Sequence, residues 1–411
     1  MVKVTFSLGA SGAGSEGGAD SPPPLLPLPP VLLPSEAAPP QTSMKGPVPA
    51  RSTDFPGSSP TMSSSRTSSP SRSNLDNRTK LGAYNILIDK GCVFPEELER
   101  HLQDVIQKSR MIPPSPNAKK VVEKRRIAAQ QNERGGIKQV EPYLLFRGEA
   151  EADDRVFGIP LIYSKDEINL ARSFLPQAPN ANISKTWGEL SQPRPDTAIG
   201  YITKADAENA VPPSQVAFSP DEDEVLDGYR LTPYLHFPFL TSQWKSPNSN
   251  QNHSHAHNQA GRDGAVIVNH LHEFYSISRE RKHEPNVVET CHFSLTCDLL
   301  NGNIFVHWRE QNTHHMELVY EFSLRKEAEV ESARQILWNI ADHAVGERLE
   351  SLKAAIPAFA KNKRHFPPIS ENTTARSVTS LDSQSWFQFR PSTPTSVVSE
   401  PAKKKRKDDN V

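Results

Sequence analysis

The chain has 411 residues and a formal net charge of −1, so no strong overall field draws it toward nucleic acid or an anionic membrane surface. No run approaches the roughly 20 consecutive apolar residues that cross a bilayer, which argues against a membrane protein. The three cysteines, Cys92, Cys291 and Cys297, are too few for a four-cysteine zinc site. The last two lie on one predicted strand, roughly 20 Å apart, so they form no disulfide framework, and a reducing compartment is favoured.

The first 77 residues are rich in proline and serine and contain neither Trp nor Tyr. A segment with so few large apolar groups cannot offset its ordering entropy by burial, so residues 1–77 are predicted to be a disordered tail. Residues 78–132 are predicted to form a helical arm and residues 133–360 a compact core domain. Residues 361–411 are predicted to be a second disordered tail.

Two short helices are predicted in the arm, over residues 95–108 and 118–131. The second carries a basic cluster that includes Lys119, Lys120 and Lys124. Such a cluster can contact a phosphate backbone, but a solvated helix face is the favoured interpretation.

The core domain mixes strand and helix patterns. Apolar residues recur at helical spacing over residues 265–277 and 327–356, and both segments are predicted helices. Alternating β-formers predict strands over residues 287–297, 304–308 and 316–322, with Asn301-Gly302 as a hairpin turn. Strands followed by flanking helices predict an α/β fold with a mixed central β-sheet flanked by helices.

A further strand, predicted over residues 236–245, carries two polar side chains that project together. Successive strand residues point to opposite faces, so Gln243 and Lys245 share one side. Earlier in the chain, Pro195 restricts the backbone just before Asp196, and an apolar stretch follows. An acid at a strand edge beside a second oxygen donor and a lysine is what a Mg²⁺-dependent hydrolase needs, because Mg²⁺ takes oxygen ligands and a lysine stabilises charge on phosphate.

At these residues the chain resembles the PD-(D/E)XK, or restriction-endonuclease-like, nuclease superfamily, and more closely an uncharacterised group of fungal proteins with a divergent version of that domain. The resemblance covers roughly residues 133–359 and implies a restriction-endonuclease-like fold. It implies that Asp196 is the metal-binding acid, that Gln243 stands in place of the second acid as a metal ligand, and that Lys245 is the catalytic lysine. An acid on a preceding helix often completes such sites, and Glu141 is the candidate for that role.

The resemblance implies Mg²⁺ as the cofactor and nucleic acid as the partner. Gln243 departs from the family pattern, because a neutral amide gives a hard cation less charge than a carboxylate does. Three hypotheses therefore stay open: a Mg²⁺-dependent nuclease, an inactive nuclease-derived binding module, and a nuclear adaptor in which the tails act and the core is a scaffold.

Two other segments carry possible functional signals. The histidines His253, His255 and His257 could converge on a transition metal, but a solvated polar loop near the mouth of the site is the favoured interpretation. The uninterrupted basic run at residues 403–407, Lys-Lys-Lys-Arg-Lys, resembles a nuclear import signal. We therefore expect a nuclear protein that binds an import receptor.

Overall fold

A computed structural model of the chain describes residues 76–111, 116–145, 161–209, 215–246 and 253–365. Most of the two predicted tails, including the basic run at residues 403–407, lies outside these ranges. At the inner ends of the tails the fold extends further than predicted. Asn77 accepts a hydrogen bond from the backbone N–H of Lys80 and begins the first helix, and the last helix ends at Asn362.

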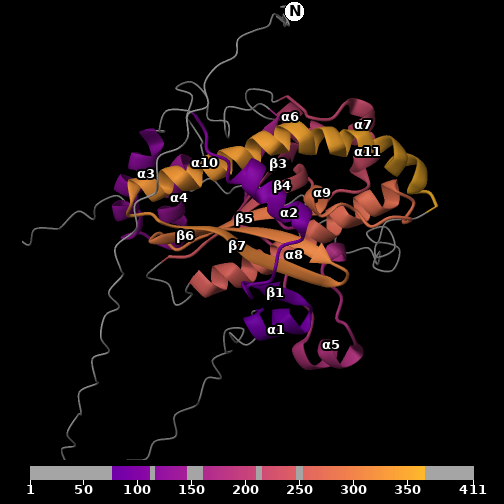
Figure 1. Cartoon of the computed structure of the whole chain (residues 1–411), viewed down its shortest axis with the longest axis horizontal. Coiled ribbons are helices and arrows are strands. Elements are labelled where there is room, and N and C mark those ends of the chain that lie inside the picture. The colour runs from indigo at the N-terminus through magenta and orange to yellow at the C-terminus, as the bar shows by residue number, and fades with distance from the viewer. Residues whose placement is uncertain (1–75, 112–115, 146–160, 210–214, 247–252, 366–411) are drawn as a thin grey trace, which may run out of the picture. The chain divides into compact units, whose positions relative to one another are not determined.

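A seven-stranded mixed sheet forms the centre of the fold (Figure 1). Its strand order is β1-β7-β6-β5-β4-β3-β2, in which β1 is parallel to β7 and β4 is parallel to β5, and the other neighbours are antiparallel. The prediction of a mixed central sheet flanked by helices is therefore confirmed. The strands are β1 Ile86–Ile88, β2 Ile162–Asp166, β3 Thr197–Ile202, β4 Leu235–Trp244, β5 His292–Cys297, β6 Asn301–Glu310 and β7 Thr313–Ser323.

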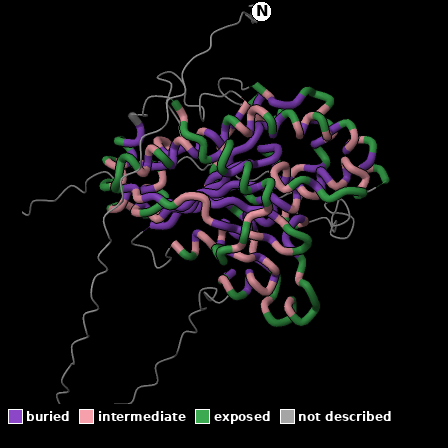
Figure 2. Tube along the Cα trace, in the orientation of Figure 1, coloured by how far each residue is buried: buried purple, intermediate pink, exposed green. Residues whose placement is uncertain are grey.

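Helices cover both faces of the sheet. Helices α2, α3, α4 and α10 pack on one face, whereas α8 packs on the other and α11 packs against α8. The buried residues accordingly concentrate in the strands and on the helix sides that face them (Figure 2). No helix among the described residues is long and apolar enough to cross a membrane. The helices are α1 Arg78–Ala83, α2 Glu96–His101, α3 Pro116–Ala128, α4 Glu133–Leu144, α5 Ala181–Trp187, α6 Lys204–Asn209, α7 Pro220–Asp227, α8 His253–Ser278, α9 Val287–Thr290, α10 Glu327–His343 and α11 Leu349–Asn362.

Strand β4 lies inside the sheet, between β5 and β3. All ten of its residues are buried, as expected for a strand with helices over both faces. Trp244 packs into the apolar cluster on the α10 side, while the neighbouring Gln243 contacts α8. The predicted opposite orientation of these two side chains is thus confirmed.

The histidine-rich residues 253–257 lie in the first turns of α8, so the predicted polar loop is wrong there. Contacts with the sheet account for the difference. His253 hydrogen-bonds Thr296 of β5 at 3.0 Å, and the ring of His257 meets Phe305 of β6 edge to face at 5.0 Å. The composition of this segment alone favours a loop, but these tertiary contacts keep it helical.

The segment 287–297 is not one strand as predicted. Asn286 caps a short helix, α9, through a hydrogen bond from the Val288 N–H, and β5 begins only at His292. Asn301 and Gly302 are also misplaced by the prediction, because they already belong to β6. Asp298 makes the turn instead: its carboxylate accepts the N–H groups of residues 300 and 301.

The predicted helix over residues 327–356 is two helices joined by a π-helical turn, Ala344–Arg348. Gly346 departs from helical geometry there, with φ of −97° and ψ of −113°. The change of direction lets α10 lie over one face of the sheet while α11 packs against α8 on the other side.

The predicted arm, residues 78–132, is an integral part of the core. Strand β1 pairs with β7 at the edge of the sheet. Beyond it, the buried carboxylate of Glu317 on β7 accepts the backbone N–H groups of Lys90, Gly91 and Cys92 at 2.9 to 3.2 Å. Hydrogen bonds to a charged group are stronger than neutral ones, so this contact fixes the segment that follows β1.

Candidate functional site

The end of β4 and the start of β3 bring the predicted site residues together. The backbone N–H of Asp196 donates to the carbonyl of Ser242 at 3.1 Å, and the Asp196 carboxylate accepts the backbone N–H of Trp244 at 2.7 Å. Trp244 lies between Gln243 and Lys245, so the acid is held beside both. The structure thus places Asp196, Gln243 and Lys245 close together at this end of the sheet.

Gln243 is 1% exposed, and its amide is only half satisfied. The nitrogen donates to the Asp263 carboxylate at 2.7 Å and to the carbonyl of Arg194 at 3.1 Å. The oxygen has no hydrogen-bond donor among the described residues. A buried acceptor without a partner is costly, so this oxygen is a candidate ligand atom.

Asp263 belongs to a buried chain of charges that ties α8 to the start of the fold. Arg262 donates to its carboxylate from Nε at 3.0 Å and from Nη2 at 2.9 Å. The same guanidinium lies 3.5 Å from Asp76, whose carboxylate also pairs with Lys80 at 2.9 Å. Burial raises the pKa of Asp263, and the contact with Arg262 opposes that shift. The arrangement fixes the Asp263 oxygen that receives the Gln243 amide.

Lys245 has an acidic partner that comes from α4. Its ammonium lies 3.4 Å from the carboxylate of Glu133, which also accepts the backbone N–H of Ser246. Asn132 sets the position of Glu133, because its side chain accepts the Gly135 N–H and starts the helix there. Lys245 itself is 4% exposed, so its charge is largely shielded from water.

The electrostatic environment of Asp196 is mixed. Burial raises the pKa of its carboxyl to about 6, and the nearby acids Glu133 and Asp263 act in the same direction. Lys245 and the N–H of Trp244 oppose the shift. Asp196 therefore changes protonation near neutral pH, which is typical of a functional carboxyl and also occurs in structural networks.

Glu141 lies elsewhere on α4 than the site prediction required. Its buried carboxylate accepts a hydrogen bond from the hydroxyl of Thr197. Thr197 directly follows Asp196, so the two side chains point to opposite faces of the sheet, and that of Thr197 faces α4. A rise of 1.5 Å per residue places Glu141 about 12 Å along the helix from Glu133. The acid that α4 brings to Lys245 is therefore Glu133.

The donor atoms fit a hard cation with few protein ligands. Asp196 offers a carboxylate and Gln243 an unpartnered amide oxygen, and Mg²⁺ takes oxygen ligands of this kind, with waters and substrate phosphate completing its shell. No group of three or more His, Cys, Asp or Glu among the described residues is arranged to hold a metal ion. His253 hydrogen-bonds Thr296 and lies 3.7 Å from Asp298.

A family model matches residues 124–356, more than half of the chain. The chain belongs to the family of a domain of unknown function, DUF7924. No curated protein matches the sequence. The DUF7924 match contains every residue of the site, from Glu133 to Asp263, whereas Asp76 lies before it. Asp76, which lies 3.5 Å from the Arg262 guanidinium, is therefore outside the matched region.

Three residues of the site within the DUF7924 match, Glu133, Arg262 and Asp263, were missed from the sequence. Asp263 and its neighbour Arg262 are charged residues directly before an apolar stretch of the helix, and such residues are seldom buried unless paired. That was the available signal for them. Glu133 gave a weaker one, since an acid directly after an Asn is common at helix starts.

Proposed function

We propose that the chain is a Mg²⁺-dependent nuclease with a divergent PD-(D/E)XK site. One observation carries the proposal: Asp196, Gln243 and Lys245, which come from two strands, meet at one end of the sheet, with the Gln243 oxygen left as an open acceptor. The element order supports it. Helix α4 is followed by the antiparallel strands β2, β3 and β4, then by α8 and by β5 parallel to β4.

Each residue has a defined part in the proposed reaction. Asp196 and the oxygen of Gln243 would hold the cation, which would supply Lewis-acid polarisation of the phosphate and of the attacking water. Lys245 stabilises the negative charge that builds on the phosphate. Asp263 holds the nitrogen of the Gln243 amide, which leaves the oxygen without a hydrogen-bond donor among the described residues, and Glu133 positions the ammonium of Lys245.

A basic surface beside the site supports nucleic acid as the substrate. Helices α3 and α4 pack together, and the structure leaves five of their cations exposed and without an ion pair among the described residues. Glu123 is the exposed acid of this pair of helices. The five are Lys119, Lys120, Arg126, Arg134 and Lys138. Phosphate neutralisation by such a cluster supplies most of the affinity in non-specific nucleic-acid binding.

This basic surface borders the site directly. Glu133, the first residue of α4, contacts Lys245, and Gly136 one turn later packs against Leu299 in the turn after β5. A Cβ at Gly136 would lie 2.9 Å from the Leu299 Cδ1 atom, so the approach is close. A nucleic-acid backbone bound along α3 and α4 would therefore lead toward Asp196.

A second candidate function is a nuclease-derived module that binds nucleic acid without cutting it. The observation that favours it is the neutral Gln243, whose amide nitrogen is engaged by Asp263. In either case we propose that the basic run at residues 403–407 directs the chain to the nucleus through an import receptor, since a dense basic run suits an acidic receptor groove. In a nuclear adaptor, by contrast, the tails would bind the partners, and the basic surface of α3 and α4 would not be needed.

The decisive experiment incubates the full chain with mixed DNA and RNA in Mg²⁺, in Mn²⁺ and in chelator. We expect metal-dependent cleavage that falls at least about 100-fold in Lys245→Ala and Asp196→Asn, because oxyanion stabilisation of this kind is worth two to three orders of magnitude. Lys185→Ala, at an exposed lysine of α5, is the control and should cleave normally. Cleavage that resists chelation or survives in Lys245→Ala would refute the proposal, and binding without cleavage would favour the second candidate.

A further inference from the structure

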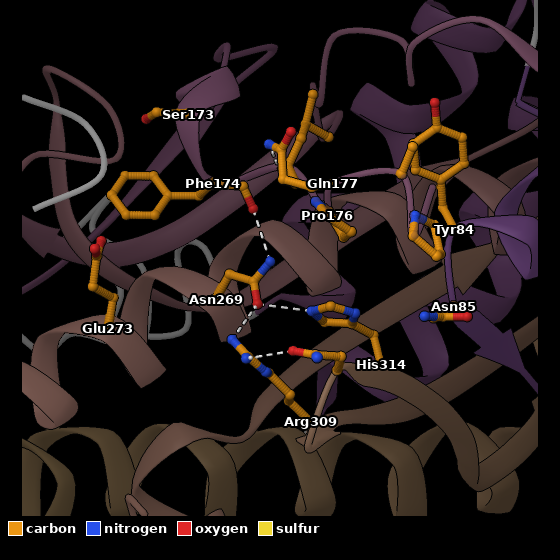
Figure 3. A pocket seen from close by; sticks show the side chains of 14 residues that line it. Tyr84, Asn85, Ser173, Phe174, Pro176, Gln177, Asn269, Glu273, Arg309 and His314 are labelled. Carbon is orange, nitrogen blue, oxygen red and sulfur yellow. Dashed lines mark hydrogen bonds between the residues drawn. The ribbon is translucent and has the colours of Figure 1, made fainter. Parts of the chain in front are cut away.

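A cavity of about 520 Å³ opens at the far end of the sheet from the candidate site. It lies between α8, the end of β6, the start of β7, the two residues that follow α1, and the segment that precedes α5 (Figure 3). Its volume is in the range of small-molecule sites. Nothing in the proposed nuclease reaction uses it.

The two sites are well separated along the strands. Thr296 of β5 is in register with Gln243 and pairs with Asn303 of β6. Arg309, which lines the cavity, follows Asn303 by six residues on the same strand, so about 20 Å separates the two ends. The cavity therefore forms a second site, and an inference about it goes beyond the proposed function.

The guanidinium of Arg309 is the main charged group of the cavity, and its contacts are neutral. It donates to the carbonyl of Gln311 at 2.5 Å and to the amide oxygens of Asn269 and Asn312 at 3.1 and 3.2 Å. No carboxylate among the described residues forms an ion pair with it. Burial lowers the pKa of Arg309, and the more distant Glu284 opposes that shift. The positive charge is thus partly desolvated and lacks a counter-ion.

A second arginine nearby shows the contrast. Arg172 lines the adjoining cavity, which shares Tyr84 and Leu175 with the first. It is already paired, with Glu189 at 3.1 Å, and also donates to the carbonyl of Leu190. Its charge is paired with a carboxylate, whereas no carboxylate among the described residues forms an ion pair with Arg309. This difference singles out Arg309 as the group that a ligand would complete.

Asn269 of α8 holds Arg309 in place. Its amide oxygen accepts from Arg309 and from the Nε2 of His314, and its nitrogen donates to the carbonyl of Phe174 (Figure 3). Burial lowers the pKa of His314 to about 3, so this ring is neutral and adds no competing charge. The guanidinium is therefore fixed before any ligand arrives, which reduces the entropy cost of binding.

The wall opposite Arg309 is apolar. Phe174, Leu175, Pro176 and Pro179 contribute it, and Figure 3 shows Phe174 and Pro176 on the side of Asn269 away from Arg309. A ligand that pairs with Arg309 would thus place its remaining atoms against carbon surface. At another end of the cavity the carboxylate of Glu273, which accepts from the Tyr229 hydroxyl, would repel an anion.

We propose that this cavity binds a small organic oxyanion, with its phosphate or carboxylate group on Arg309 and its apolar part against Phe174 and Pro176. Five guanidinium N–H groups in a planar fork match either anion, and three of them are used by the contacts above. An oxyanion on the remaining two supplies the missing counter-charge. A neutral molecule of the same shape cannot do so.

The test uses isothermal titration of the full chain with phenyl phosphate, benzoate and benzyl alcohol. We expect saturable binding of at least one of the two anions, and binding of the neutral alcohol at least about 10-fold weaker, since the alcohol cannot accept charge-assisted hydrogen bonds as an anion does. Binding of one anion alone identifies the phosphate or the carboxylate as the group recognised. Absence of binding by both anions, or equal binding of the alcohol, overturns the proposal.

Variants locate the anion. Arg309→Gln should weaken anion binding at least about 10-fold, and Arg309→Lys by a smaller factor because it keeps the charge and loses the fork. Arg172→Gln is the matched control and should bind within about twofold of the unaltered chain, since its arginine is already paired. If Arg309→Gln does not fold, the Lys variant and the control decide between the outcomes. Equal losses at Arg172 and Arg309, or no loss at Arg309, would overturn the assignment.

Discussion

The amide nitrogen of Gln243 donates a hydrogen bond to the carboxylate of Asp263 across 2.7 Å. This contact ties Gln243 of β4 to a fully buried acid on α8, and Arg262 also donates to that acid. The orientation of Gln243 therefore depends on the helix as much as on its own strand. The expected effects of Asp263→Asn and Gln243→Glu both depend on this contact.

Breaking the Arg262 and Asp263 pair should destabilise the fold strongly. Asp263→Asn leaves a buried guanidinium with the more distant Asp76 as its acidic partner among the described residues, and the loss of one partner of a buried pair costs about 3 to 5 kcal/mol. Urea denaturation measures the change in unfolding free energy. The control is Glu167→Gln, which removes the exposed partner of Arg194 and should cost less than about 1 kcal/mol. Similar small losses in both variants would contradict this view of the network.

The raised pKa of Asp196 predicts a pH-dependent stability. The pKa of its carboxyl is about 6 in the folded state against 3.8 without the environment, so the folded chain binds this proton more tightly. The corresponding stability is fully present below about pH 4 and is lost as the pH rises through about 6. The difference in unfolding free energy between the unaltered chain and Asp196→Asn should fall by about 2 to 3 kcal/mol from pH 4 to pH 7. A difference that stays flat across urea titrations in this range would exclude a raised pKa.

The basic surface of α3 and α4 should contribute electrostatically to nucleic-acid binding. Replacing Lys119 and Lys120 with Gln should weaken binding of every sequence alike and reduce the slope of log K against log salt by about 1 to 2. Binding isotherms at several salt concentrations give this slope. Lys90→Gln with Lys185→Gln removes the same charge from other exposed positions and should leave the slope nearly unchanged. Equal effects of the two pairs would mean that only net charge matters.

The sequence predicted the sheet and three site residues because these depend on local patterns. Alternation over β4 determines which side Gln243 faces, and Pro195 marks the start of β3. Asp263 and Glu133 could not be assigned to the site in this way, because their partners lie 20 and 112 residues away. The histidines at the start of α8 show the same limit, since contacts with β5 and β6 make that segment helical.

The basic tail should decide where the chain accumulates. Replacing Lys403, Lys404, Lys405 and Lys407 with Ala removes the charges that an import receptor would bind, so a fluorescently tagged chain should move from the nucleus to the cytoplasm. Replacement of Lys119 and Lys120 serves as the control for a general loss of charge and should leave the chain nuclear. Continued nuclear accumulation of the tail variant would show that the import signal lies elsewhere.

Gln243→Glu tests the proposed metal site most directly. The new carboxylate would face Asp263 at hydrogen-bond distance without the amide N–H that now joins them. Without metal we therefore expect a loss of several kcal/mol, because a buried charge would lack a partner. Mg²⁺ should restore much of that stability and increase cleavage, since the variant gives the cation a charged ligand at nearly constant shape.

The same variant distinguishes a metal site from a packed amide. If the cation is held by residues 196 and 243, adding Asp196→Asn to Gln243→Glu should abolish the recovery by Mg²⁺. Melting temperatures of the single and double variants, with and without Mg²⁺, measure this. A loss of stability that Mg²⁺ leaves unchanged would mean that Gln243 serves packing alone. The proposal of a nuclease would then fail, and the binding module would be the better account.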